Sequence, residues 1–402
     1  MTFALLIALT SALPPAARVV IEDPAELPRL RDNLAWVSLA DRRFDPKEIA
    51  RWFALVVDPF DAKSLARVGL DTSRRVDVYV GAAIVLEGTV KDPETFDGTS
   101  GKGEVALTRA NGPGRIAIGR IAIGRKAHDP KELTKDLKRS KPKLPACAAQ
   151  KDRPAVYGDL AFEEAQGRLG EWFTGANFAM WWPSSDLEIC LELKPRVGAE
   201  LAIGTIPSGG KALALLETSS AAASGFAHLG AESIRRLASR LGATTKDASV
   251  LGGDLGATLT KDGIVAAVSL SSKPAKERQR VARAEALGRL VQLVAASYPG
   301  AKTEVTDEHL FVALGEERRL EMGSKKPALD SPVVVELSPP LVFEALLARA
   351  LRGEPGPSPM AFTVVRMGFG AFIDSMKRVS VRAGPRPGRL EVTARIERRA
   401  TE

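Results

Sequence analysis

The stretch VVVELSPPLVFEALLARAL, from Val333 to Leu351, contains the pattern that decides the fold of this chain. Its valine-rich start predicts a short apolar strand, and the segment after Ser338 predicts an amphipathic helix. Residues 378–396 read RVSVRAGPRPGRLEVTARI and predict a hairpin, because Val379 and Val381 share one face of its first strand. The unit is therefore a strand, a helix and a hairpin.

The same arrangement recurs upstream. LAWVSLA (Leu34–Ala40) predicts a strand, and the helix after it begins at Asp45, a residue type favoured at helix N-caps. AVYGDLA (Ala155–Ala161) predicts the strand of a second copy, whose helix is expected to reach Phe173, and ALALLET (Ala212–Thr218) predicts that of a weaker third copy. These recurrences indicate an α+β fold, with repeated strand–helix–hairpin modules forming mainly antiparallel sheets covered by amphipathic helices.

The chain length favours more than one domain, and composition shifts suggest where the boundaries lie. A basic stretch rich in Lys and Pro predicts a linker, and a long helix is expected over Pro274–Tyr298. The expected segments are a signal peptide over 1–17, a first α+β module over 18–125, the basic linker over 126–153, a central region of two modules over 154–325, and a C-terminal strand–helix–hairpin module over 326–402.

The N-terminus carries the information on location. Phe3 to Leu13 is an uncharged apolar run, and small residues and prolines follow it before the first charge at Arg18. This order is typical of a secretory signal with cleavage near Ala17, and the run is too short to span a bilayer. The alternative is a buried first strand or helix of a cytosolic protein. We expect export to the periplasm or the extracellular space, with no transmembrane span in the mature chain.

The two cysteines, Cys147 and Cys190, fit this location. In an oxidising compartment they can close a loop of about 44 residues, worth about 4 kcal/mol in the chain-entropy description. The apolar alternation of LEICLEL predicts that Cys190 points to the more accessible face of its strand. Two unpaired thiols are the alternative.

The charge balance is only mildly basic, with 57 Lys and Arg against 49 Asp and Glu and a net charge of +8 over 402 residues. A positive surplus of this size is typical of a solvated surface, and a binding site for an anionic ligand is the alternative. The tandem pentad in GRIAIGRIAIGRK (Gly114–Lys126) predicts a strand bent or bulged at Gly119, or two short strands. It lacks the exposed aromatic residues on which bases stack, and no nucleic-acid partner is expected.

Motifs for catalysis and cofactors are weak. The three histidines, His128, His228 and His309, form no HExxH or Cys–His pattern, so neither a metal nor another cofactor is expected. GTSGKGE (Gly98–Glu104) lacks the Ser or Thr that a phosphate-binding loop places after its lysine. SGGK (Ser208–Lys211) joins two strand-like runs and is expected to be a turn. The many carboxylates are compatible with a catalytic pair of acidic residues, but the sequence does not indicate which two would form it.

Two groups of residues are candidates for ligand contact. Trp181 and Trp182 in MWWPSSD point to different sides in any regular structure, so one of them could face a ligand, while core packing of both is the common outcome. Arg378, Arg382 and Arg395 lie opposite the apolar face of the last hairpin and could bind an anion, or form a solvated face.

These features predict an exported, soluble, non-enzymatic protein of the bacterial envelope that binds a partner or has a structural role. Two alternatives stay open. The first is a periplasmic carrier of an amphiphilic or anionic small molecule. The second is a hydrolase that uses dispersed carboxylates or a lone serine.

Overall fold

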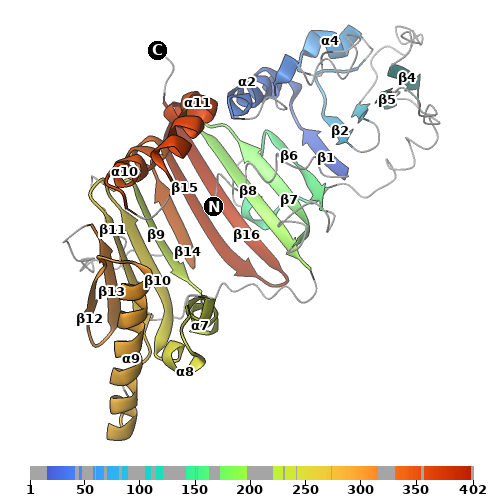
Figure 1. The fold of residues 1–402 in the computed structure, drawn as a ribbon. Helices are drawn as coiled ribbons and strands as arrows, with labels where there is room; N and C mark the ends of the chain where they lie inside the picture. The colour runs from blue at the N-terminus through green and yellow to red at the C-terminus, as the bar shows by residue number, and fades with distance from the viewer. Residues whose placement is uncertain are drawn as a thin grey trace. The chain divides into compact units, whose positions relative to one another are not determined.

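The computed structural model describes residues 16–40, 45–47, 58, 60–67, 70–80, 84–88, 105–109, 115–120, 142–149, 151, 153–162, 173–196, 221–229, 231–240, 242–272, 274–315, 331–354 and 357–399. These residues form an α+β structure in which helices accompany extensive antiparallel β-sheet (Figure 1). The chain divides into two compact units, Met1–Ala199 with Gly388–Thr393 and Glu200–Pro387 with Ala394–Glu402.

The first unit is built on antiparallel strands in the order β8-β7-β6-β1-β2-β3-β5-β4. The strands are β1 (Ala16–Ile21), β2 (Val76–Val80), β3 (Ile84–Gly88), β4 (Val105–Arg109), β5 (Arg115–Arg120), β6 (Val156–Ala161), β7 (Phe173–Trp181) and β8 (Leu187–Pro195). The helical segments are η1 (Pro24–Glu26), α2 (Leu27–Ser38), α4 (Ala62–Arg67) and η4 (Ala146–Ala148).

Strand β1 lies inside this sheet, because it pairs with β2 on one side and with β6 on the other. Side chains on both of its faces are buried: Val20 is fully buried, and its neighbours Val19 and Ile21 lie on the opposite face, where Ile21 is also buried. The strand includes Ala16 and Ala17, so cleavage near Ala17 would leave Arg18 to Ile21 to pair with both neighbours.

The strand expected over Leu34–Ala40 is wrong, because these residues belong to the end of helix α2 and the turn after it. The helical region begins upstream at Asp23, whose carboxylate accepts a hydrogen bond from the Ala25 N–H at 2.9 Å, and it continues without interruption into α2. Leu27, Asn33 and Trp36 are its buried residues, and Asn33 and Trp36 lie three positions apart, as neighbours on the helix surface. The apolar segment LAWVSLA is too short to distinguish the two-residue period of a strand from the 3.6-residue period of a helix.

The second unit has the strand order β12-β13-β11-β10-β9-β14-β15. These strands are β9 (Ala223–His228), β10 (Leu251–Leu259), β11 (Ile264–Leu270), β12 (Lys302–Val305), β13 (His309–Leu314), β14 (Val333–Leu337) and β15 (Met376–Arg386). Its helices are α7 (Ala231–Arg240), α8 (Thr245–Ala248), α9 (Glu277–Ser297), α10 (Pro339–Leu351) and α11 (Pro359–Ser375). Strand β16 (Arg389–Arg398) follows β15 after a two-residue connection, where Gly388 adopts a φ of 70°.

Two apolar clusters hold the helices of the second unit. Ile234 and Ala238 of α7 pack with Leu251 of β10 and with Ala286 and Leu290 of α9. A separate cluster joins α10 and α11, with the rings of Phe343 and Phe362 in an edge-to-face contact at 5.6 Å between centroids. Helices α10 and α11 lie side by side next to β15 (Figure 1). Among the residues that the structure describes, none of the helices is long and apolar enough to cross a membrane.

A common pairing rule links these elements. β1 pairs with β2, β6 with β7, β9 with β10 and β14 with β15, so each of these strands pairs antiparallel with the next strand in the chain. The leading strands also pair with one another inside each unit, β1 with β6 and β9 with β14. These pairings connect β2 to β7 through β1 and β6 in the first unit, and β10 to β15 through β9 and β14 in the second.

Two further expectations differ from the structure. Phe173 opens strand β7 and does not end a helix. The residues that follow it, Gly175 to Met180, pair with both β6 and β8, so sheet pairing overrides the helical spacing seen in the sequence. The register between β4 and β5 is regular across Gly119, which shows no bulge at that position. Residues 121–126 lie outside the described part of the chain.

The short helix α8 offers a test of electrostatics in the second unit. The Thr244 hydroxyl donates to the Asp247 carboxylate at 2.6 Å, and the Arg289 guanidinium lies 2.7 Å from it. These contacts, the Thr244 hydrogen bond first, hold the pKa of Asp247 below its usual range. Asp247→Asn is therefore expected to lower the melting temperature at pH 7, measured by circular dichroism.

A lowered folded-state pKa means that the stabilisation by Asp247 is present above its unfolded pKa of about 3.9 and is lost as the pH falls below it. The difference between wild type and Asp247→Asn should thus shrink progressively as the pH falls below about 4. The exposed Asp262→Asn serves as the matched control and should follow the wild type throughout. A difference between wild type and Asp247→Asn that stays constant from pH 7 to pH 3 would contradict this assignment.

Candidate functional site

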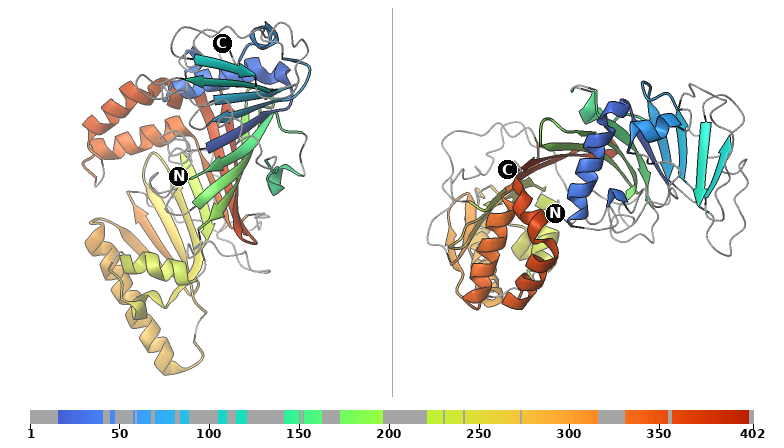
Figure 2. Two further views of the ribbon diagram at one scale, coloured as in Figure 1. Left: turned by 90° about the vertical axis from the view of Figure 1, so that its right-hand side faces the viewer. Right: turned by 90° about the horizontal axis from the view of Figure 1, so that it is seen from above.

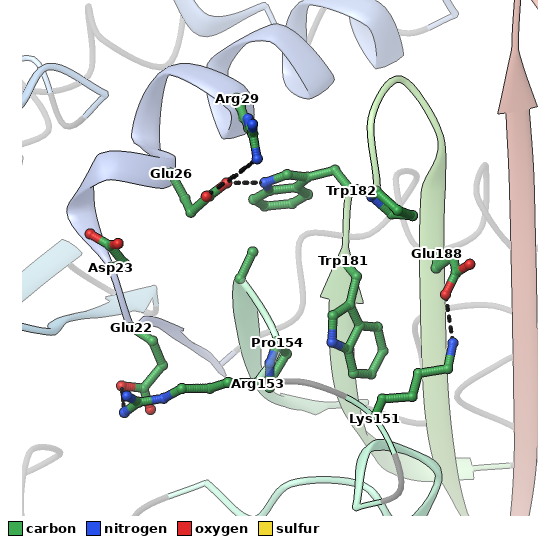
Figure 3. Close-up of a pocket in the computed structure, with 12 residues that line it drawn as sticks. Glu22, Asp23, Glu26, Arg29, Lys151, Arg153, Pro154, Trp181, Trp182 and Glu188 are labelled. Atoms are coloured by element: carbon green, nitrogen blue, oxygen red, sulfur yellow. Dashed lines mark hydrogen bonds and ion pairs between the residues drawn. The ribbon is translucent and has the colours of Figure 1, made fainter.

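A pocket of about 720 Å³ opens on the first unit, and both tryptophans selected from the sequence lie in its wall (Figure 3). The remaining wall comes from the connection after β1, from the residues before β6 and from the start of β8. The lining consists of the acidic residues Glu22, Asp23, Glu26 and Glu188, the basic residues Arg29, Lys151 and Arg153, the two tryptophans, and Pro154, Ala155 and Pro183.

The two tryptophans are held in different ways. Trp181 ends β7, is 9% exposed and packs with Val20, Tyr157 and Cys190, while the Lys151 ammonium lies 5.0 Å from the centre of its ring. Trp182 is 4% exposed, and its indole N–H donates a hydrogen bond to the Glu26 carboxylate. Both rings are therefore largely packed, and they wall the pocket instead of standing free in solvent.

The carboxylates of the pocket are all engaged by donors of this chain. Glu22 accepts a hydrogen bond from the Tyr157 hydroxyl at 2.9 Å and forms an ion pair with Arg153. Glu188 lies 2.6 Å from the Lys151 ammonium. Asp23 accepts from a backbone N–H, and Glu26 accepts from Trp182. The acidic groups are thus fixed in place before any ligand arrives.

A buried ionic network lies behind Glu22. Arg18 and Asp77, each 8% exposed in its side chain, form an ion pair at 2.7 Å, and the Arg75 Nε lies 2.7 Å from the same carboxylate. This hydrogen bond is the main cause that raises the pKa of Arg75 above its ordinary value. Burial, followed by the hydrogen bond to Glu22, raises the pKa of Tyr157 to about 12. Tyr157 therefore stays protonated at neutral pH, and its hydroxyl donates a hydrogen bond to Glu22.

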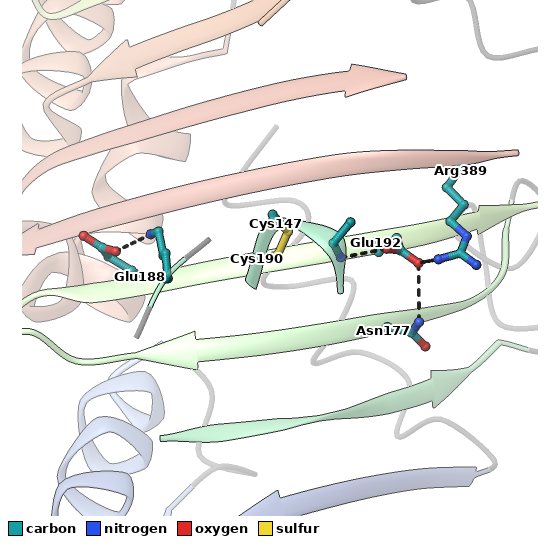
Figure 4. Close-up of a disulfide and its surroundings, with 8 residues drawn as sticks. Cys147, Asn177, Glu188, Cys190, Glu192 and Arg389 are labelled. Carbon is teal, nitrogen blue, oxygen red and sulfur yellow. Dashed lines mark hydrogen bonds and ion pairs between the residues drawn. A yellow bond between two sulfur atoms is a disulfide. The ribbon is translucent and has the colours of Figure 1, made fainter. Parts of the chain in front are cut away.

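Cys147 and Cys190 are joined as a disulfide in the structure, with Cα atoms 6.2 Å apart (Figure 4). The accessible orientation expected for Cys190 is wrong, because this residue is 2% exposed. Residues Cys190 to Leu193 are all buried, so β8 is covered on both faces there. The segment around η4 supplies part of that cover, since Ala148 belongs to the same apolar cluster as Cys190 and Trp181.

Glu192 lies two residues beyond Cys190 on the same face of β8 and is 2% exposed (Figure 4). Its carboxylate accepts hydrogen bonds from the Ala146 N–H at 3.0 Å and from the Asn177 amide at 3.4 Å, and it forms an ion pair with Arg389. A buried carboxylate satisfied in this way orders the segment before Cys147. Nothing in the sequence pattern distinguished Glu192 from the other acidic residues.

The three arginines selected from the sequence belong to the second unit, and none of them is among the residues that line this pocket. Arg378, Arg382 and Arg395 occupy exposed positions of β15 and β16, whereas Val379 and Val381 between them are buried. Arg378 forms an ion pair with Glu336, and Arg395 lies 3.9 Å from Glu397. The wall of this pocket therefore includes the two tryptophans selected from the sequence and none of the three arginines.

The remaining sequence candidates contribute little to this site. Residues 98–104 and 208–211 lie outside the described part of the chain, as does His128. The Nδ1 atom of His228 lies 2.6 Å from the Asp254 carboxylate, and His309 is buried at 5% exposure. In the described ranges, no group of three His, Cys, Asp or Glu side chains is arranged to hold a metal ion.

Sequence reasoning missed the acidic and basic residues of the pocket. Glu22 and Arg153 are 131 positions apart, and Glu26 and Trp182 are 156 apart, so only the sheet brings them together. The one usable local signal was the Asp23–Pro24 pair, a helix start that places Glu26 and Arg29 one turn apart. Comparison with protein-family models, characterised proteins and solved structures finds no match to this chain.

Proposed function

We propose that this protein is a non-catalytic binding protein of the bacterial envelope, which takes an anionic amphiphilic small molecule in the pocket of its first unit. The observation that carries the proposal is the pocket itself, with a volume of about 720 Å³, two tryptophan walls and fixed charges. Its volume lies in the range of small-molecule sites, which combine apolar walls with a few placed polar groups.

The charge of the ligand follows from the exposure of the charged side chains. The side chains of Arg153, Arg29 and Lys151 are 75%, 61% and 44% exposed, respectively. Their carboxylate partners are recessed, with Glu22 at 9%, Glu188 at 19% and Glu26 at 25%. An incoming ligand therefore meets N–H donors first. Such a surface favours a carboxylate, sulfate or phosphate group, because hydrogen bonds between two ionised partners are the stronger ones.

The apolar part of the ligand follows from Trp181 and Trp182. Their edges, together with Pro154 and Pro183, give the wall a flat apolar area next to the donors. Indole rings combine large contact area with little conformational entropy, which suits them to hold a ring or an alkyl segment. An anion carrying such a group satisfies both parts of the pocket.

The same geometry argues against a hydrolase at this site. A general acid or base needs a free carboxyl group within reach of the substrate. Each of the four carboxylates that line the pocket already accepts a hydrogen bond or ion pair from this chain. Binding, with the carboxylates positioning the basic side chains, is the function that this arrangement favours.

The envelope location rests on the N-terminal sequence. The apolar run Phe3–Leu13 and the small residues up to Ala17 are typical of a signal that is cleaved on export, and residues 1–15 lie outside the described part of the chain. An oxidising compartment would also preserve the Cys147–Cys190 disulfide.

We further propose that the fold arose by repetition of one module, a strand followed by a helix and a hairpin with helices covering the sheet. The pairing of β1 with β2, β6 with β7, β9 with β10 and β14 with β15 supports this reading. The antiparallel pairing of leading strands, β1 with β6 and β9 with β14, is the same in both units.

Native mass spectrometry of the protein recovered from its own cells tests the proposal. We expect a chain cleaved near Ala17 that carries a noncovalent adduct, which is lost on collisional activation. A full-length chain would contradict the envelope location, and a chain without any adduct under gentle conditions would count against a resident ligand.

A defined probe then tests the site. Naphthalene-1-sulfonate should bind in isothermal titration, and Lys151→Gln with Arg153→Gln should weaken it at least about tenfold, equal to about 1.4 kcal/mol. Arg378→Gln in the second unit is the matched control and should leave the affinity unchanged, while uncharged naphthalene should bind more weakly. Equal binding by wild type and the double variant would contradict the assignment of this pocket.

A further inference from the structure

The second unit contains a pocket of a different kind, which lies between helices and sheet and is partly open to solvent. Its volume is about 200 Å³, and all of its lining residues are aliphatic. It lies between α7 and α9 on one side and strands β10, β11 and β13 on the other. Figure 2 shows these two helices over the same face of the strands. It shares no residue with the charged pocket of the first unit.

The strand side of the pocket follows from the sheet register. Leu255, Val268 and Leu310 are direct cross-strand partners on β10, β11 and β13 and form one row. Ala266 and Val312 form the next row on the same face, two residues further along. All five line the pocket. The wall is therefore set by regular antiparallel pairing, which makes it a rigid surface.

The helix side comes from residues at helical spacing. Ile234 and Ala238 of α7 lie one turn apart, and Leu290, Leu293 and Val294 occupy one stripe of α9. Ile234, Ala238 and Leu290 are also members of the apolar cluster that attaches both helices to β10. The helices are thus anchored beside the pocket, and the space between them and the strands is not a loose gap.

Small side chains leave this space unfilled. Alanine stands at position 238 on the helix side and at position 266 on the strand side, where a leucine would reach across. Ala266 and Val268, which both line the pocket, are only partly buried. Packed interiors seldom keep a void of this size, because its lining atoms lose their dispersion contacts.

We propose that this pocket is a second binding site, which takes a small uncharged apolar group, such as one aromatic ring or the end of an alkyl chain. Water gains nothing there, since no lining side chain offers it a hydrogen bond. An engineered aliphatic cavity of about 150 Å³ in another protein stays dry and binds benzene or xenon, so a single ring fits the volume found here. This site goes beyond the proposed function, because it lies in the second unit and favours an uncharged apolar ligand instead of an anionic one.

Benzene is the probe that tests the site, with the full chain and methyl NMR as the readout. We expect saturable shifts of the methyl groups of Leu290 and Val312, together with a higher melting temperature. Ala266→Leu should fill the pocket from the strand side and weaken benzene binding at least about tenfold. Ala284→Leu on the exposed face of α9 is the matched control and should bind benzene like the wild type.

Ala238→Leu fills the pocket from the helix side and replaces Ala266→Leu if that variant does not fold. No methyl shift in the wild type at saturating benzene would overturn the proposal. Undiminished binding in a folded filled variant would overturn it as well, because the benzene would then lie elsewhere. Naphthalene-1-sulfonate binding at the first unit is expected to be the same in all these variants, so failure of one site is distinguishable from failure of the other.

Discussion

Replacing Cys147 with serine is expected to lower the free energy of unfolding under oxidising conditions by about 4 kcal/mol. The disulfide to Cys190 closes a loop with a sequence separation of 43 residues, which restricts the unfolded chain. In the folded state it ties the segment around η4 to β8, next to Ala148 and Trp181. Urea unfolding followed by tryptophan fluorescence measures the difference.

Reduction provides the control for this variant. In the presence of dithiothreitol, wild type and Cys147→Ser should unfold at nearly the same urea concentration, because neither then has the bridge. Glu192 still accepts the Ala146 N–H in both, so the η4 segment keeps one attachment to β8. Identical unfolding of the two proteins before reduction would show that the bridge does not form or does not constrain the chain.

Replacing Gly158 with alanine is expected to destabilise the first unit by about 3 kcal/mol. Gly158 lies in β6 between β1 and β7, where it faces Val19 and Phe178. An added Cβ would overlap the backbone carbonyl oxygen of Arg18 and would lie 2.8 Å from the ring of Phe178. The carbonyl belongs to an interior strand and cannot move without breaking the pairing of β1. Differential scanning calorimetry measures the loss as a lower melting temperature.

Gly225→Ala is the matched control. Gly225 also lies in a leading strand, β9, and faces a valine of the neighbouring strand, Val335. A Cβ there meets its nearest atoms at 3.6 and 3.7 Å, which is ordinary contact. We expect this variant to be unchanged or more stable by up to about 1 kcal/mol, because alanine restricts the unfolded chain. Equal destabilisation of both variants would show that the crowding at Gly158 has no special cost.

The spacing of apolar residues correctly predicted several of the strands and helices that the structure describes. The strands Val156–Ala161 and Val333–Leu337 and the helices Glu277–Ser297 and Pro339–Leu351 occur where the sequence predicted them. It missed α11, whose exposed side carries apolar residues such as Met360, Val364 and Met367, so that no polar face marks the helix. It also misread residues 34–40, because a short apolar window fits a strand and a helix equally well.

The candidate site was predicted only in part. Trp181 and Trp182 stood out because adjacent tryptophans are rare, and both line the pocket. The sequence did not single out Arg153, Lys151 and Glu22, because charged residues occur throughout the chain. Only the pairing of distant strands brings these three charged residues together at the pocket. Arg378, Arg382 and Arg395 share a face of the last hairpin, as alternation predicts, but alternation does not reveal which side chains lie near a pocket.

The sequence by itself determined the α+β class and the positions of several strands and helices. These depend on local periodicity and on turn and cap residues, which act over a few positions. Only the tertiary structure decided that β1 is an interior strand, that Cys190 is buried beside Glu192, and that Glu22 and Arg153 meet at one pocket. Those outcomes depend on which distant strands pair, and the free energy of that pairing comes from burial shared between segments that no local pattern connects.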